Sequence, residues 1–177
     1  TIAGSVFKLN AVKNLTVSND LSIDPAAGEE VKVSSALNFG AVSGKTLTTG
    51  DNVVLLSSAT STAGLGDVTG NSISGKMSVE RFINTGTTGG AHPKTWQFLS
   101  APTIGQSIFD AWQEAGSANP GYGTWITGTG SGFDAASSLP ALKYYNPATN
   151  LWDGETNTAN PVNNGKGYMI FVRGDRT

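Results

Sequence analysis

Short runs of alternating apolar and polar residues fill roughly the first 75 residues of the chain. Apolar side chains at every second position are typical of strands with one buried face. Turn-forming sequences separate the runs, among them Ser18-Asn19-Asp20, Ser43-Gly44-Lys45 and Thr49-Gly50-Asp51. The apolar positions of the runs are Leu15, Val17, Leu21, Ile23, Val31, Val33, Leu37, Phe39, Leu47, Val53–Leu56 and, more weakly, Val68 and Ile73.

The spacing of these runs predicts a repetitive N-terminal unit. The runs recur roughly every 16–20 residues, which is the range of one coil in a β-solenoid. Each short strand buries few apolar side chains, so stability would come from stacking one coil on the next. A meander or one half of a β-sandwich would have similar spacing and is the alternative interpretation. We therefore expect a solenoid-like unit over residues 1–75.

A strand pattern that is partly apolar on both faces follows, from Lys76 to Ile83. A turn rich in glycine and threonine comes next, over residues 84–90. The alternation then resumes from Trp96 to Ser100 and stops before Pro102. This order predicts a hairpin that joins the two halves of the chain.

The remaining pattern predicts one helix and a set of strands. Apolar residues at helical spacing indicate a helix over Thr103–Gly116, with Ser107 or Thr103 as its cap. A long loop covers Asn119–Leu139, and a short strand begins at Leu142. Gly167–Arg173 is the most apolar strand of this half, which favours a central position in a sheet. The predicted fold is all-β: a solenoid-like unit (residues 1–75) packed against a β-sandwich-like domain (residues 76–177) with one short helix.

Composition excludes several classes of function. Only 14% of the residues are charged and the net charge is −2, whereas nucleic-acid binding needs clustered lysine and arginine. The chain has no cysteine, so disulfides and thiolate metal sites are impossible. No apolar run approaches the roughly 20 residues that span a bilayer. Abundant Gly, Ser, Thr and Asn with little Lys or Glu resembles the composition of extracellular β-proteins.

Catalytic chemistry finds little support in the residues. With His92 as the single histidine, neither a zinc site nor a Ser/His/Asp triad is expected. Asp110 and Glu114 lie four residues apart on the predicted helix, where a solvated face is the simpler interpretation than a general-acid pair. We predict that the protein is not an enzyme and has neither catalytic residues nor a resident cofactor.

Two binding hypotheses remain open. Tyr122, Trp125 and Trp152 stand among glycines and small polar residues, and their rings could stack on sugars. The simpler interpretation is that these rings anchor long loops onto the domain. Calcium bound through Asp134 or through Asp153-Gly154-Glu155 is a second hypothesis, although no complete ligand loop is legible.

Four motifs in order resemble a module found in large secreted surface proteins of Bacteroidetes. They are Val79-Glu80-Arg81-Phe82-Ile83, Trp96–Pro102 (WQFLSAP), Asp110–Glu114 (DAWQE) and Gly167–Arg176 (GYMIFVRGDR). The resemblance covers about Leu55 to Thr177, and none of its motifs carries a catalytic residue. It implies export by the type IX secretion pathway and display on the cell surface, in some members as adhesins or filaments. Because members usually continue past the last motif, the domain is expected to be truncated at its C-terminus.

Together these features predict a non-enzymatic structural or adhesive module of a secreted bacterial surface protein or extracellular filament. Its expected partners are other surface-protein subunits or copies of itself, and glycans in the alternative hypotheses. Those alternatives are a carbohydrate-binding module that uses the loop aromatics, and an accessory domain of a secreted hydrolase. The expected location is extracellular, at the cell surface, without membrane insertion by this segment.

Overall fold

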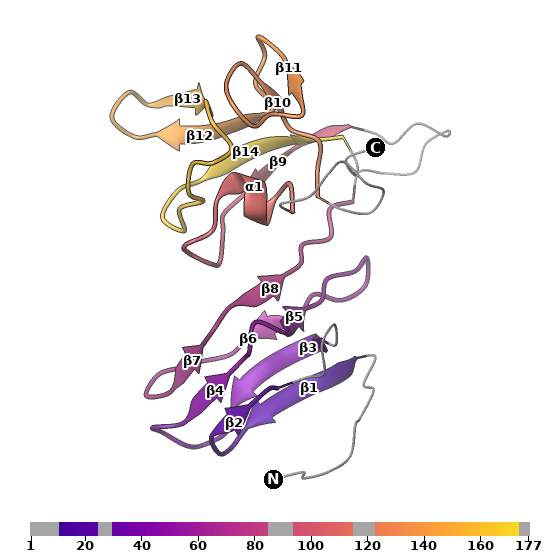
Figure 1. The fold of residues 1–177 in the computed structure, drawn as a ribbon, viewed down its shortest axis with the longest axis vertical. Helices are drawn as coiled ribbons and strands as arrows, with labels where there is room; N and C mark the ends of the chain where they lie inside the picture. Colours follow the sequence, from indigo (N-terminus) through magenta and orange to yellow (C-terminus); the bar gives the residue numbers. More distant parts are fainter. Residues whose placement is uncertain (1–10, 25–29, 85–93, 115–122, 174–177) are drawn as a thin grey trace. The chain divides into compact units, whose positions relative to one another are not determined.

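The computed structural model describes residues 11–24, 30–84, 94–114 and 123–173. These residues form β-strands with one short helix, so the all-β prediction is confirmed. The chain divides into two compact units, Thr1–Asn84 and Thr85–Thr177 (Figure 1). This division lies beyond the expected boundary after Gly75, because the strand at Met77 pairs within the first unit.

Two parallel sheets make up the first unit. The larger sheet has five strands. Four of them follow the order β1 (Val12–Val17), β3 (Val31–Phe39), β5 (Val53–Leu55) and β8 (Met77–Val79), and the fifth, β6 (Gly64–Leu65), also pairs with β3. The smaller sheet has the order β2 (Leu21–Ser22), β4 (Thr46–Thr48) and β7 (Ser72–Ser74). Every strand pair in both sheets is parallel.

The strand registers align apolar residues in ladders that run across the sheets. Leu47 lies between Leu21 and Ile73 in the smaller sheet, and Val53 lies between Val31 and Met77 in the larger one. Paired positions are 21 to 28 residues apart along the chain. This offset exceeds the predicted 16–20 residues because each repeat contributes a strand to both sheets. The buried core of the unit consists of Val17, Ile23, Val33, Leu37, Leu47, Val53, Leu55 and Ala63.

The second unit contains a four-stranded antiparallel sheet. Its order is β13 (Leu151–Gly154), β12 (Leu142–Asn146), β14 (Tyr168–Val172) and β9 (Thr95–Leu99). The central position predicted for the Gly167–Arg173 strand is therefore confirmed for β14. A short parallel pair, β10 (Thr127–Gly128) and β11 (Ala135–Ala136), lies inside the predicted long loop.

The predicted hairpin between the two halves is wrong. Strand β8 pairs with β5 in the first unit, whereas β9 pairs with β14 in the second. Alternation identified both strands correctly but carries no information about which strand each one joins. Most of the predicted turn, from residue 85 onward, lies outside the described residues.

Helix α1 (Ile108–Ala111) is much shorter than the predicted Thr103–Gly116. The preceding residues are extended instead: Ser107 forms an antiparallel bridge with Pro161, and the carbonyl of Gln106 accepts the N–H of Val162. Ser107 caps the helix as predicted, since its hydroxyl accepts the Asp110 N–H at 3.0 Å. Tertiary pairing thus overrides the helical periodicity before Ser107.

Candidate functional site

The four-stranded sheet of the second unit has one buried and one exposed face. On the buried face, Leu142, Tyr168 and Ile170 are almost fully inaccessible to solvent. The Trp112 ring, just after α1, meets the Tyr168 ring edge-on at 5.1 Å. This contact places Trp112, the residue that follows α1, against the buried face of the sheet.

The opposite face is covered by aromatic side chains that remain exposed to solvent. Phe98 is 71% exposed and Trp96 is 41% exposed, both on the edge strand β9. The registers place their neighbours on the same face, because directly opposed residues of paired strands point the same way. The residues of this aromatic face are Trp96, Phe98, Tyr145, Trp152, Met169 and Phe171.

Ring contacts join the aromatic residues of this face into two groups. Trp152 contacts Phe98 at 5.6 Å and Tyr145 at 5.6 Å, and Trp96 contacts Phe171 at 5.1 Å. These ring planes are tilted by 51° to 60° with respect to one another. Aromatic pairs at such separations contribute about 0.5–1.5 kcal/mol each beyond their buried area. The rings therefore hold one another in fixed, non-coplanar orientations.

Two cations border the aromatic face. The Lys143 ammonium lies 5.5 Å from the Trp96 ring, and the Arg173 guanidinium lies 4.7 Å from the Phe171 ring. No acidic residue shares this face within the four strands. The surface is thus apolar with a positive rim. Trp, Tyr, Phe, Met and Arg are the residues that are enriched at protein–protein interfaces.

The three aromatic residues predicted to bind a ligand do not lie together in the structure. Trp152 belongs to the aromatic face, where it packs on two other rings. Trp125 is half-buried in the segment before β10, and no ring contact brings it to Trp152. Tyr122 lies outside the described residues. The sequence therefore predicted one of the six residues, although the alternation Trp96, Phe98 in β9 was a usable signal for two more.

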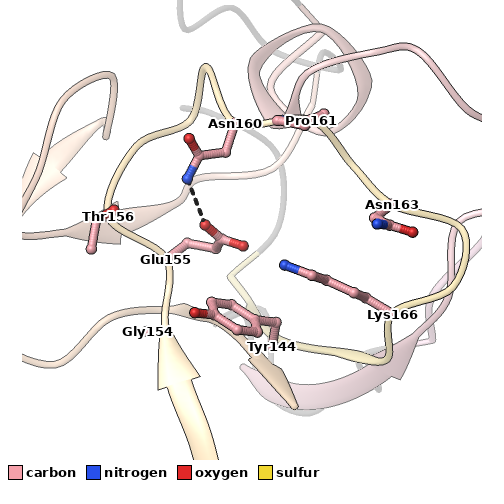
Figure 2. A pocket seen from close by; sticks show the side chains of 8 residues that line it. All are labelled: Tyr144, Gly154, Glu155, Thr156, Asn160, Pro161, Asn163 and Lys166. Atoms are coloured by element: carbon pink, nitrogen blue, oxygen red, sulfur yellow. Dashed lines mark hydrogen bonds between the residues drawn. The ribbon is translucent and has the colours of Figure 1, made fainter. Parts of the chain in front are cut away.

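A small polar pocket lies at the other side of the same sheet, because Tyr144 points away from its neighbours Lys143 and Tyr145 in β12 (Figure 2). Its volume is about 200 Å³. The lining residues are Tyr144, Gly154, Glu155, Thr156, Asn160, Pro161, Asn163 and Lys166. They come from the middle of β12, the end of β13 and the loop between β13 and β14.

Glu155 is the buried acid of this pocket, with 5% of its surface exposed. Its Oε2 atom accepts a hydrogen bond of 3.0 Å from the Asn160 side-chain amide. The Lys166 ammonium lies 4.1 Å from the Tyr144 ring and points toward the Glu155 carboxylate (Figure 2). Burial raises the pKa of the nearby Tyr168 phenol; the N–H of Asn163 opposes this, and the Glu155 carboxylate adds to it.

The carboxylates proposed for calcium contact amide donors. Asp134 accepts hydrogen bonds from the Gln113 side chain at 2.9 Å and from the Ile126 N–H at 2.8 Å. Asp153 accepts one from the Asn146 side chain at 2.7 Å. The described ranges contain no group of three or more His, Cys, Asp and Glu side chains arranged for a metal. Calcium binding stays a hypothesis without a geometrical site.

No protein-family model, curated protein or solved structure was found to match this chain. The resemblance to secreted Bacteroidetes surface proteins therefore stays a prediction from the four motifs. In the part of the chain that the structure describes, no helix has the length and hydropathy to cross a membrane.

Proposed function

We propose that this chain is a non-enzymatic structural and adhesive module of a secreted bacterial surface protein or extracellular filament. In this proposal the first unit is a solenoid-like stack of coils and acts as a stiff scaffold. The parallel pairings and the apolar ladders through Leu47 and Val53 support it, because each repeat buries its side chains only by contact with its neighbours.

The observation that carries the proposal is the exposed aromatic face of the second unit. A soluble surface rarely keeps so many large apolar side chains together unless they bind something. Here the occupant we propose is a second copy of the chain, with its own aromatic face turned toward the first. The β-sandwich-like domain of the sequence analysis would then be completed by two sheets packed face to face.

Cation–π contacts make such self-association reasonable despite the positive rim. Lys143 and Arg173 already lie over aromatic rings of their own copy, so the rings of a partner offer them the same favourable surroundings. Four strands of about five residues span roughly 300 Å² per copy, which is well below a stable standard-size interface. We therefore expect weak pairwise contacts that become effective when many copies are displayed together.

The ring geometry favours a protein over an extended sugar chain on this face. A flat glycan is bound best by rings that present parallel faces, whereas the rings here are tilted by 51° to 60°. Tilted rings interdigitate well with side chains of another protein surface. Carbohydrate binding by the loop aromatics is thus the weaker hypothesis for this face.

Sedimentation velocity over a range of concentrations tests the proposal. The wild-type chain should show a sedimentation coefficient that rises with concentration, and Phe98→Lys should abolish the rise. Leu139→Lys is the matched control, because Leu139 is 79% exposed but lies in the loop before β12. A wild-type chain that stays monomeric up to millimolar concentration would exclude self-association, as would equal effects of the two substitutions.

A further inference from the structure

The polar pocket beside β12 has features of a prepared binding site that the proposed assembly does not use. Several backbone hydrogen bonds fix its walls: Glu155 N–H to the Leu142 carbonyl at 3.0 Å, and Val162 N–H to the Gln106 carbonyl at 2.9 Å. The Lys166 N–H donates to the Asn163 carbonyl at 3.1 Å. The lining side chains are thus presented from constrained backbone on both sides of the cavity.

A buried carboxylate faces an ammonium across this cavity without pairing with it. Glu155 and Lys166 point toward each other (Figure 2), yet Lys32 and Glu30 form the one ion pair found within 4.0 Å among the described residues. Asn160 bonds one oxygen of the Glu155 carboxylate. Burying a carboxylate is costly unless its remaining lone pairs are satisfied. The cavity therefore has an acceptor on one wall and a donor on the other, separated by open space.

The charges of these two groups select the chemistry of a ligand. An anion would be attracted by Lys166 but repelled by Glu155, and a cation would meet the reverse. A neutral hydroxyl suits both, because it can donate to the carboxylate and accept from the ammonium at the same time. Charge-assisted hydrogen bonds of this kind are stronger than neutral ones.

We propose that this pocket binds a single hydroxyl-rich sugar residue, such as the terminal residue of a glycan. The cavity of about 200 Å³ has room for one sugar ring. Adjacent hydroxyls of the ring bridge Glu155 and Lys166, and the side-chain amide of Asn160 keeps the carboxylate in place. The site is independent of the aromatic face, which lies on the other side of the sheet.

The experiment is a two-dimensional ¹H–¹⁵N NMR titration of the full chain with methyl glycosides of glucose, galactose and mannose, and with N-acetylglucosamine. At least one sugar should shift the amide signals of residues 154–166 with a dissociation constant of about 1 mM. Glu155→Gln and Lys166→Met should each weaken that binding at least tenfold. Lys13→Met is the matched control, because Lys13 is an exposed lysine of the first unit that belongs neither to the pocket nor to the aromatic face, and it should leave the affinity unchanged.

Three outcomes would overturn the assignment: no shifts with any sugar, shifts confined to the aromatic face, or binding that survives both pocket substitutions in chains whose spectra remain well dispersed. Glycine serves as a zwitterionic probe, and binding of glycine in place of sugars would also overturn it. Because Phe98→Lys should leave sugar binding intact, failure of this inference can be distinguished from failure of the proposed assembly.

Discussion

Single residues in the turns of the first unit connect segments that lie 25 to 26 residues apart along the chain. The Asp20 carboxylate accepts the Thr46 N–H at 2.9 Å, and the Asp51 carboxylate accepts the Lys76 N–H at 2.6 Å. Both aspartates stood in sequences that predicted turns. Turn propensity alone could not show these longer contacts, because it concerns a residue and its nearest neighbours only.

Gly50 is the turn residue for which we expect the sharpest effect of substitution. Its φ is +57°, and a Cβ at this position would lie 2.4 Å from the carbonyl oxygen of Ile23. Gly44 also has a positive φ of +68° but open space around it, so Gly44→Ala isolates the cost of the backbone conformation. Gly50→Ala should lower the free energy of unfolding by about 1–3 kcal/mol more than Gly44→Ala, as measured by urea denaturation. Equal effects would mean that a Cβ at position 50 is accommodated beside the Ile23 carbonyl at no cost.

Tyr168 should make stability fall at high pH. Its pKa is raised by burial above the ordinary value of 10.0 that applies in the unfolded chain. The unfolded state therefore loses this proton first, and the stabilisation that is complete below pH 10 is lost as pH rises from 10 through the raised folded pKa. Urea midpoints measured above pH 10 should decline less steeply in Tyr168→Phe than in the wild-type chain.

At the scale of elements, the sequence predicted the strands better than their partners. Alternation located most strands of the first unit because one face of each is buried. It could not assign β8 to β5, nor show that the strands divide between two sheets, since both depend on contacts between distant residues. The predicted start of the helix was wrong for the same reason. Ile104 fits the helical spacing, but it is 72% exposed, because the backbone at Gln106 and Ser107 pairs with the 161–162 segment.

The apolar ladder Leu21, Leu47 and Ile73 of the smaller sheet offers a direct test of how the strands of the first unit stack. Leu47 is fully buried between Leu21 and Ile73, whereas Leu65 on β6 is 43% exposed. Leu47→Ala should lower the free energy of unfolding by about 2–5 kcal/mol, because it removes a side chain from the middle of the ladder. Leu65→Ala, the same chemical change, should cost under about 1 kcal/mol. Chemical denaturation followed by circular dichroism would measure both, and similar costs would contradict the ladder.

At the scale of the whole molecule, the sequence predicted two units but only part of the candidate site. The sequence predicted strand β14, because the run Tyr168–Val172 is apolar at every position and such runs occupy the centre of a sheet. The same run signalled an apolar second face, which Phe171 and Met169 provide. The pocket left no local signal, because Glu155 and Lys166 line one cavity only after the loop between β13 and β14 folds back toward Tyr144.

The placement of tryptophan gives the two units separate signals. All four tryptophans, Trp96, Trp112, Trp125 and Trp152, follow Asn84, so tryptophan emission should report unfolding of the second unit alone. Far-ultraviolet circular dichroism reports the strands of both units.

Each unit has its own buried core, so a core substitution in one should not change the stability of the other. Leu47→Ala should therefore move part of the circular-dichroism transition and leave the emission transition in place, whereas Leu142→Ala should move the emission transition. If Leu47→Ala shifted the emission midpoint as much as Leu142→Ala does, the chain would unfold as one cooperative body, and the first unit could not act as an independent scaffold.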